Sequence, residues 1–277
     1  AAETHPSAAF SCDVITTDGL QKSVMRLADR VMAGADDCGA QLLFGRPPRL
    51  REGAFEKGTT ESEQDFAVRM ATAIDRTTLA IQGPPGAGKT YIGARMILAL
   101  VAAGKKVGMM ATSHKVIRNL LDEVVAQAAN ARQPVKVGAK PGEMSDTPGP
   151  IVEFDDNAAA LAAITSGDVS VLGGTSFMWA REEFAAAVDV LVVDEAGQVS
   201  LANVLAVSQA ANSLVLLGDP QQLDQPEKAS HPDGVGVSAL QHVLGEHGTM
   251  PPDRGIFLPI TWRMSPTLTS FNSELFY

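Results

Sequence analysis

The sequence predicts an α/β fold in which a parallel sheet is covered by helices on both faces. Two observations carry this prediction. After residue 60, short apolar runs alternate with segments of helical period, which is the pattern of repeated strand–helix units. A glycine-rich segment, Gly83–Thr90, lies between the first of these runs and the helix-like segment after it. Strands that alternate with helices in this way pair in parallel and are buried on both faces.

Composition limits the class of protein. The chain has 277 residues, of which 45% are hydrophobic and 19% are charged, as in globular domains rather than disordered chains. This length suits one large domain or two modest ones. No apolar run approaches the ~18 residues that a membrane span needs. The first residues carry neither a basic region nor an apolar block, so we expect no secretory signal, a cytoplasmic protein and no membrane partner.

The net charge of −10 limits how the chain binds nucleic acid. Proteins that coat duplex DNA are normally basic, because neutralised phosphates supply the affinity. Any nucleic-acid contact of this chain is therefore expected to be local. Cys12 and Cys38 are too few for a cysteine-rich zinc site or a disulfide framework. A reduced pair is favoured over a single disulfide.

Residues 1–60 are expected to hold one helix and a linker. Apolar residues from Leu20 to Val31 have helical spacing and predict a helix over residues 20–33. The segment Gly45–Gly58 is rich in arginine, proline and glycine and predicts a loop. Its four cations either contact a polyanion or belong to a solvated linker, and the second interpretation is favoured. These cations are Arg46, Arg49, Arg51 and Lys57.

Strands and helices are predicted in alternation from residue 79 onward, the strands from short aliphatic runs and the helices from apolar residues at three- and four-residue spacing. The strands are expected at Leu79–Gln82, Val107–Ala111, Val169–Leu172, Val188–Val193 and Leu214–Leu217. The helices are expected at Gly88–Ala103, Lys115–Ala129 and Ser200–Ala210, with a further helix capped by Asp155 and Asp156. Arg132–Pro150 is predicted as a loop or the root of a small insertion, and Pro220–Gly236 as a loop.

One segment fits the phosphate-binding pattern G-x-x-x-x-G-K-[ST] between a predicted strand and a predicted helix. It reads Gly83-Pro84-Pro85-Gly86-Ala87-Gly88-Lys89-Thr90. Glycines let the backbone wrap a phosphate with its N–H groups pointing inward, and the positive end of the helix faces the same anion. Lys89 is placed to reach the β- and γ-phosphates, and Thr90 offers a hydroxyl to Mg²⁺. This context disfavours the alternative, a turn that fits the pattern by chance.

The strand at Val188–Val193 ends in two carboxylates, Asp194 and Glu195. Ligands bind at the carboxyl ends of strands in open α/β sheets, so Asp194 is expected beside the phosphates, where it holds Mg²⁺. Glu195 is placed to polarise the attacking water. Alone, the two carboxylates are equally consistent with the cap of the next helix. The phosphate-binding loop about 105 residues upstream favours the catalytic interpretation.

A third strand, at Leu214–Leu217, runs into the polar segment Gly218-Asp219-Pro220-Gln221-Gln222-Leu223. An amide at this position can hydrogen-bond a γ-phosphate or the attacking water and report hydrolysis to neighbouring elements. Gln222 is the first candidate for that role and Gln221 the second. The alternative is a solvated turn. Trp179 and Trp262 are expected to be core or rim aromatics rather than base-stacking platforms.

Taken in order, these motifs resemble superfamily 1 helicases of the 5′→3′ branch. The ordered set consists of Gln64, residues 83–90, 194–198 and 218–223, Thr261-Trp262-Arg263-Met264, and residues 271–277. The resemblance covers about residues 60–277. Within that group the chain is most similar to the helicase half of bacterial proteins that carry a RecB-like nuclease upstream. The resemblance implies a RecA-like P-loop ATPase domain that uses ATP and Mg²⁺.

The resemblance also implies roles for residues that match its motifs. Gln64 matches the glutamine that reads adenine, although an ordinary helix glutamine is the alternative. Arg263 matches the arginine that points at the γ-phosphate. Two positions depart from the family pattern. His114 stands where the family has asparagine, and Gly197 lengthens the acidic motif.

Two strand-end motifs of the family hold single-stranded nucleic acid. Thr112, Ser113 and Lys115 match the first of them, and Thr175 matches the second. Hydroxyl and ammonium groups at such positions contact phosphate and sugar. Thr112 or Ser113 can also cap the helix that follows, and the two roles are compatible.

The resemblance divides the chain into an N-terminal helix and linker region at 1–60, a RecA-like ATPase domain at 61–250 and the start of a truncated second RecA-like domain at 251–277. We therefore expect a fragment of a larger nuclease–helicase, with the nuclease domain in the same or a partner chain. Lys89, Glu195, Gln222 and Arg263 are the expected catalytic residues. Hydrolysis is expected to drive movement on single-stranded DNA or RNA, with DNA favoured. The alternative is an ATP-dependent switch or binding module without unwinding activity.

Overall fold

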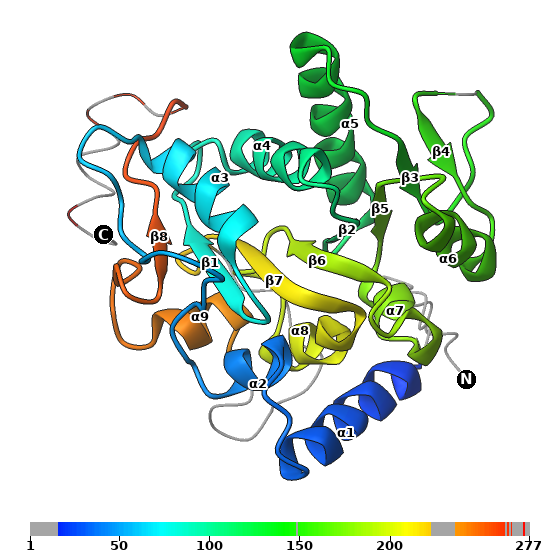
Figure 1. The fold of residues 1–277 in the computed structure, drawn as a ribbon, viewed down its shortest axis with the longest axis horizontal. Coiled ribbons are helices and arrows are strands. Elements are labelled where there is room, and N and C mark those ends of the chain that lie inside the picture. Colours follow the sequence, from blue (N-terminus) through cyan, green and yellow to red (C-terminus); the bar gives the residue numbers. More distant parts are fainter. Residues whose placement is uncertain are drawn as a thin grey trace, which may run out of the picture.

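The computed structural model describes residues 16–147, 149–222 and 236–263, together with Ser265, Thr267 and Glu274. Within them, parallel strands form one eight-stranded sheet with the order β4-β3-β5-β2-β6-β7-β1-β8 (Figure 1). The strands are β1 (Thr78–Gln82), β2 (Val107–Met110), β3 (Val137–Ala139), β4 (Ile151–Glu153), β5 (Val171–Gly174), β6 (Val188–Val193), β7 (Ala211–Gly218) and β8 (Gly255–Phe257). This arrangement confirms the predicted RecA-like α/β class.

Helices cover both faces of the sheet, as predicted (Figure 1). The helices on one face are α3 (Glu63–Ala73), α4 (Lys89–Ala102) and α5 (His114–Ala131). The helices on the other are α1 (Asp18–Met32), α2 (Cys38–Leu43), α6 (Asn157–Ser166), α7 (Ser176–Trp179), α8 (Leu201–Val207) and α9 (Ala239–Leu244). Because successive strand residues point to opposite faces, β6 supplies Leu191 and Val193 to one apolar cluster and Val190 and Val192 to the other. None of the described helices is both long and apolar enough to cross a membrane.

Most predicted elements occur within three residues of their expected bounds. The β5 strand is shifted by two residues: it begins at Val171 rather than Val169 and ends at Gly174 rather than Leu172. It therefore includes Gly173 and Gly174, which were expected after the strand. The helix predicted over Ser200–Ala210 is shorter than expected. It ends as α8 at Val207, and Ser208–Ala210 forms a 3₁₀ turn in which the Ser208 hydroxyl donates to the carbonyl of Leu205.

The prediction of a loop over Arg132–Pro150 is wrong at Val137–Ala139, which forms β3. This short strand lies between β4 and β5 and hydrogen-bonds to both, so long-range pairing overrides the nearby proline and glycine. The predicted cap at Asp156 is confirmed, because its carboxylate accepts from the amide of Ala159 at 2.8 Å. Most of the loop predicted over Pro220–Gly236, residues 223–235, lies outside the described residues.

The N-terminal region packs against the core of the eight-stranded sheet. Leu20 and Leu27 of α1 belong to the same apolar cluster as α8. The buried Ser23 hydroxyl donates to the carbonyl of Ala206 at 2.6 Å and accepts from Gln209. Strand β8 follows residue 250 and pairs with β1, so it completes the first sheet. The division at residues 60 and 250 stays a prediction.

The basic linker is held by ion pairs to neighbouring carboxylates, which favours the solvated-linker interpretation. The pairs are Arg46 and Arg49 with Asp36, Arg51 with Asp75, and Lys57 with Glu63. The Cys38 thiol is buried, and burial raises its pKa to about 12. Cys12 lies outside the described residues.

We predict that α1 unfolds together with the sheet. Leu27 is 2% exposed, so Leu27→Ala should lower the free energy of unfolding by about 2–4 kcal/mol within a single denaturant transition. Met25, on the same helix, is 63% exposed, and Met25→Ala should change it by less than about 0.5 kcal/mol. A separate early transition that only Leu27→Ala shifts would contradict this prediction.

Candidate nucleotide-binding site

The phosphate-binding loop leaves β1 at the carboxyl edge of the sheet and leads into α4. The amide of Gly83 donates to the carbonyl of Gly218 on the neighbouring strand β7, at 2.9 Å, which fixes the start of the loop. Gly86 and Gly88 have φ angles of 82° and 80°, in the left-handed region that glycine adopts without strain. The first turn of α4 leaves backbone N–H groups without intrahelical acceptors. A glycine loop that leads into a helix start is the arrangement from which anion cradles are built, and phosphate binding at this loop stays a prediction.

Lys89, the first residue of α4, is buried beneath this loop. Its ammonium donates to the carbonyl of Gly83 at 2.7 Å. Burial lowers the pKa of the amine, whereas the carboxylates of Glu195, Asp219 and Asp194 act to raise it. The ammonium is therefore close to three acidic groups. Thr90, the next residue, is exposed at the start of the helix.

Asp194 is a buried carboxylate at the end of β6, with 4% of its surface exposed. Its amide donates to the carbonyl of Met110 on β2 at 2.9 Å, and its Oδ1 accepts from the amide of Glu195 at 2.9 Å. Burial, together with the charge of Glu195, raises the pKa of Asp194 to about 6. A carboxylate this deep is unfavourable unless a cation accompanies it. Carboxylate and hydroxyl oxygens are the ligands that Mg²⁺ takes, so Asp194 and Thr90 fit that ion.

Glu195 has a φ of 54°, in the left-handed region that non-glycine residues rarely adopt. Strain of this kind costs roughly 1–3 kcal/mol and is common at functional sites. Two backbone hydrogen bonds maintain this left-handed conformation of Glu195. The amide of Ala196 donates to the carbonyl of Leu217 at 2.7 Å, and the amide of Gln198 donates to that of Glu195 at 2.8 Å. The helix that follows is capped by Ser200, so the two acidic residues do not serve as its cap.

The structure gives a reason for Gly197 in the acidic motif. A Cβ atom at this position would overlap the carbonyl of Asp219 and lie 3.1 Å from the nitrogen of Pro220. The backbones after β6 and after β7 are therefore in direct contact. The amide of Gln222 donates to the carbonyl of Asp219 at 3.3 Å, which forms a turn at the same edge. Gln222 is half-buried and Gln221 is exposed, and the role of either amide stays a prediction.

The segment after β8 returns to the phosphate-binding loop. The hydroxyl of Thr261 donates to the carbonyl of Pro85 at 2.9 Å, and the amide of Trp262 donates to that of Gly86 at 2.9 Å. A Cβ atom on Gly86 would overlap the side chain of Arg263. The charge of Arg263 also acts to lower the pKa of Lys89. The structure therefore brings Arg263 to the loop. Met264 lies outside the described residues.

A pocket of about 230 Å³ lies between α3 and this returning segment. Gln64 lines it from α3, where it is half-buried, and Ala87 and Ile92 line it from the loop and α4. Leu258 and Trp262 form part of the opposite wall. Trp262 was expected to be a core or rim aromatic rather than part of the site, and its position next to Arg263 was the only sequence signal for a place here. Its side chain is 73% exposed, whereas Trp179 is core, as predicted.

The residues predicted to contact single-stranded nucleic acid lie at the carboxyl ends of the adjacent β-strands β2 and β5. Thr112, Ser113 and Lys115 follow β2 and are exposed, and Thr175 follows β5. Ser113 also caps α5, since its hydroxyl accepts from the amide of Val116 at 3.3 Å. These residues share an edge of the sheet with the phosphate-binding loop, and β6 and β7 separate the two groups.

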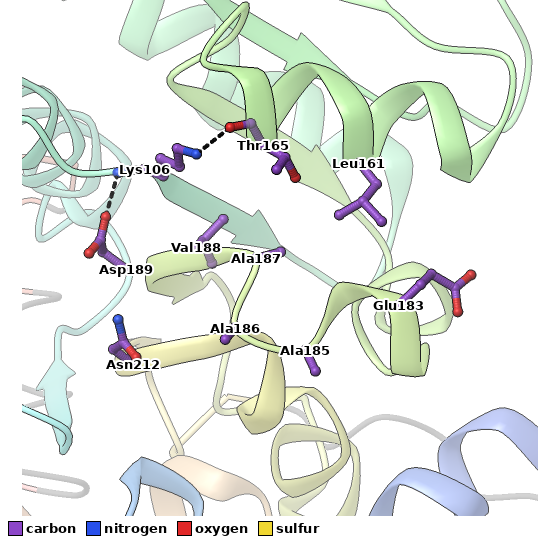
Figure 2. Close-up of a pocket in the computed structure, with 10 residues that line it drawn as sticks. All are labelled: Lys106, Leu161, Thr165, Glu183, Ala185, Ala186, Ala187, Val188, Asp189 and Asn212. Atoms are coloured by element: carbon purple, nitrogen blue, oxygen red, sulfur yellow. Dashed lines mark hydrogen bonds between the residues drawn. The ribbon is translucent and has the colours of Figure 1, made fainter.

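The amino edge of the sheet has a hollow of about 510 Å³ that contains none of the predicted site residues (Figure 2). Three of its polar residues are linked by hydrogen bonds. The Lys106 ammonium donates to the carbonyl of Thr165 at 2.6 Å, and the Lys106 amide donates to the Asp189 carboxylate at 2.9 Å (Figure 2). We assign these contacts a structural role.

Comparison with known proteins identifies one domain family and several relatives. A family described as AAA domain matches residues 59–235. The DNA replication ATP-dependent helicase/nuclease dna2 of Schizosaccharomyces pombe is 28% identical over 84% of this chain. The corresponding protein of Saccharomyces cerevisiae is 24% identical over 93%, and JHS1 of Arabidopsis thaliana is 23% identical over 83%. The chain spans only 17% to 18% of the length of these relatives.

Among solved structures, the UvsW helicase of bacteriophage T4 is similar with a TM-score of 0.43 and 14% identity, covering 86% of this chain and 77% of that one. The arterivirus nonstructural protein 10 helicase in complex with DNA has a TM-score of 0.39 and 19% identity. That match covers 64% of this chain and 35% of the other.

We predict that the nucleotide-free fold becomes less stable as pH rises, because of Asp194. Its native pKa of about 6 exceeds the ordinary value of 3.8, so the native state holds the proton more tightly. The stabilisation is complete below pH 3.8 and is lost as pH rises to about 6, a change of about 3 kcal/mol. Asp194→Asn should therefore stabilise the chain at pH 8 and have little effect near pH 4.

Denaturant melts at several pH values measure this difference. Asp146→Asn, at an exposed carboxylate, is the control and should show no such trend. An Asp194→Asn effect that is independent of pH, or a loss of stability at pH 8, would contradict the prediction.

Proposed function

The chain belongs to the AAA domain family, and on that premise we propose that it is the ATP-hydrolysing motor core of a superfamily 1 helicase. The observation that carries this proposal is the clustering of charge around Lys89. Its amine lies within the electrostatic reach of Asp194, Glu195 and Arg263 at one loop of the sheet. A lysine, two carboxylates and an arginine around a phosphate cradle are the groups that phosphoryl transfer uses.

ATP binds with its phosphates in the Gly83–Thr90 loop and its adenine in the 230 Å³ pocket. The amide of Gln64 hydrogen-bonds the edge of the base, and the indole of Trp262 covers its face. On binding, the Lys89 ammonium exchanges the carbonyl of Gly83 for the β- and γ-phosphate oxygens. Thr90 and Asp194 hold Mg²⁺, which when bound neutralises charge on those oxygens.

Hydrolysis then depends on three further side chains. Glu195 orients the attacking water and accepts its proton, and the strained backbone at this residue is of a kind common at functional sites. Arg263 neutralises the charge that develops on the transferred phosphoryl group. Gln222 hydrogen-bonds the γ-phosphate or the attacking water. When the γ-phosphate is lost, this change reaches the acidic motif through the contact between Asp219 and Gly197.

Single-stranded nucleic acid binds across the ends of β2 and β5, where Thr112, Ser113, Lys115 and Thr175 contact phosphate and sugar. DNA is favoured over RNA because the relatives are named DNA replication helicase/nucleases. Because the chain spans 17% to 18% of those relatives, it supplies one motor domain of a larger protein. The nuclease domain lies elsewhere in that protein or in a partner chain, and we place the protein in the cytoplasm.

We predict that single-stranded DNA raises ATP turnover by this chain tenfold or more, equivalent to about 1.4 kcal/mol of barrier. Glu195→Gln should lower turnover about 10²- to 10⁴-fold and leave ATP affinity unchanged, because it removes only the base. Glu183→Gln, at the amino edge, is the control. A coupled ATPase assay with DNA and RNA strands measures both effects. ATP binding without any response to strands would favour the switch interpretation instead.

We also predict that Trp262 increases the affinity for ATP by contacting the adenine base and not the phosphates. Stacking of a base on an aromatic ring is worth roughly 1–3 kcal/mol, so Trp262→Ala should weaken ATP binding at least about fivefold. Affinity for inorganic tripolyphosphate should be unchanged. Phe44, which is also exposed but remote from the pocket, provides the control Phe44→Ala. Equal losses for ATP and tripolyphosphate, measured by calorimetry, would show that Trp262 does not contact adenine.

A further inference from the structure

A second pocket at the carboxyl edge lies beside the residues predicted to contact single-stranded nucleic acid. It has a volume of about 490 Å³, which is within the range of ligand sites. Its walls come from the start of α5 and from the segment after β3. Lys115, one of the predicted strand contacts, lines it directly. The pocket therefore continues the predicted path of the single-stranded nucleic acid from the end of β2 toward the end of β3.

The pocket has cationic groups that other residues do not neutralise. Among the described residues, neither Lys115 nor Lys140 forms an ion pair, and the Lys140 ammonium has only the carbonyl of Pro141, at 3.2 Å. Arg118, in contrast, is bound to Asp122 and Glu153, each at 2.9 Å. In a chain of net charge −10, two unpaired lysines at one pocket favour an anionic ligand.

The carboxylates of this pocket leave that preference intact. One oxygen of Glu153 accepts from Arg118 and the other from the amide of Ser145 at 2.6 Å, so both are already bound. Glu143 also lines the pocket and is exposed, which limits its effect on the lysines through solvent screening.

The remaining wall is formed by the imidazole of His114 and by apolar groups. His114 lies against the backbone of Gly142, where a Cβ atom would be 3.1 Å from Cδ2 of the imidazole ring and 3.2 Å from Nε2. Ile117, Ala139 and Pro141 complete this side of the pocket. An imidazole ring held against the backbone offers a face on which a base can stack. His114 is also the position at which the chain departs from the family's asparagine.

From this geometry we propose that the pocket binds one nucleotide of the single strand, with its base on His114 and Pro141 and its phosphate between Lys115 and Lys140. The inference rests on the proposed function and adds two residues, His114 and Lys140, that no motif assigned. The hollow at the amino edge has a similar volume, but the carboxylates of Glu183 and Asp189 line it beside its one lysine, Lys106, so it does not attract a phosphate in the same way.

The experiment measures binding of labelled oligothymidylate by fluorescence anisotropy over a range of salt concentrations. Lys140→Ala should weaken binding about fivefold near 0.1 M salt and lower the slope of log K against log salt by about 0.7, as loss of one phosphate contact does. Lys140→Arg should keep the slope. Lys136 precedes the same strand at the opposite edge and is exposed, so Lys136→Ala is the matched control and should change nothing.

The base contact needs a separate measurement. His114→Ala should weaken binding of oligothymidylate about fivefold or more and leave binding of an abasic oligonucleotide unchanged. Equal effects on both oligonucleotides would overturn the stacking contact. If Lys140→Ala behaves like Lys136→Ala while Lys115→Ala weakens binding, this inference fails and the proposed function stands. If the unaltered chain binds no single strand, the proposed function fails and this inference fails with it.

Discussion

The buried carboxylate of Asp194 is the group around which the nucleotide site is arranged. Its position at the end of a strand that is almost wholly buried removes it from water, and a charge there is stable only beside compensating groups. The amide of Glu195, which donates a hydrogen bond of 2.9 Å to the carboxylate, and the nearby ammonium of Lys89 provide part of that compensation. This incomplete compensation of the Asp194 carboxylate supports the proposal that Mg²⁺ binds here together with ATP.

Main-chain hydrogen bonds connect the parts of this site more directly than side chains do. Gly83 bonds to Gly218, Ala196 to Leu217 and Trp262 to Gly86, so three segments far apart in sequence share one backbone network. Such bonds depend little on side-chain identity and hold their geometry tightly. They also maintain the strained conformation of Glu195. The phosphate-binding loop is therefore bonded directly to β7 and to the segment that carries Arg263, and β7 is bonded in turn to the acidic motif.

The sequence predicted the central strands and the phosphate-binding loop well because those features are local. Strand β6 is a continuous aliphatic run, and the loop needs glycine at fixed positions. Strand β3 was missed because three residues next to prolines become a strand only when neighbours on both sides hydrogen-bond to them. Trp262 was missed for a related reason, since the other wall of the pocket it lines is formed by residues about 170 to 200 positions away along the chain. Tertiary contacts of this kind leave no periodic signal.

The distribution of ion pairs supports the proposal that this acidic chain binds a polyanion locally. The linker cations Arg46, Arg49, Arg51 and Lys57 are all neutralised by carboxylates, although they were the most conspicuous basic cluster in the sequence. Lys115 and Lys140 are less conspicuous in the sequence, yet no described carboxylate pairs with them. The local potential depends on unpaired charge within about a Debye length, roughly 8–10 Å, rather than on net charge. Few phosphates can then be contacted at once, so specificity for a single strand has to come from bases and sugars as well as from charge.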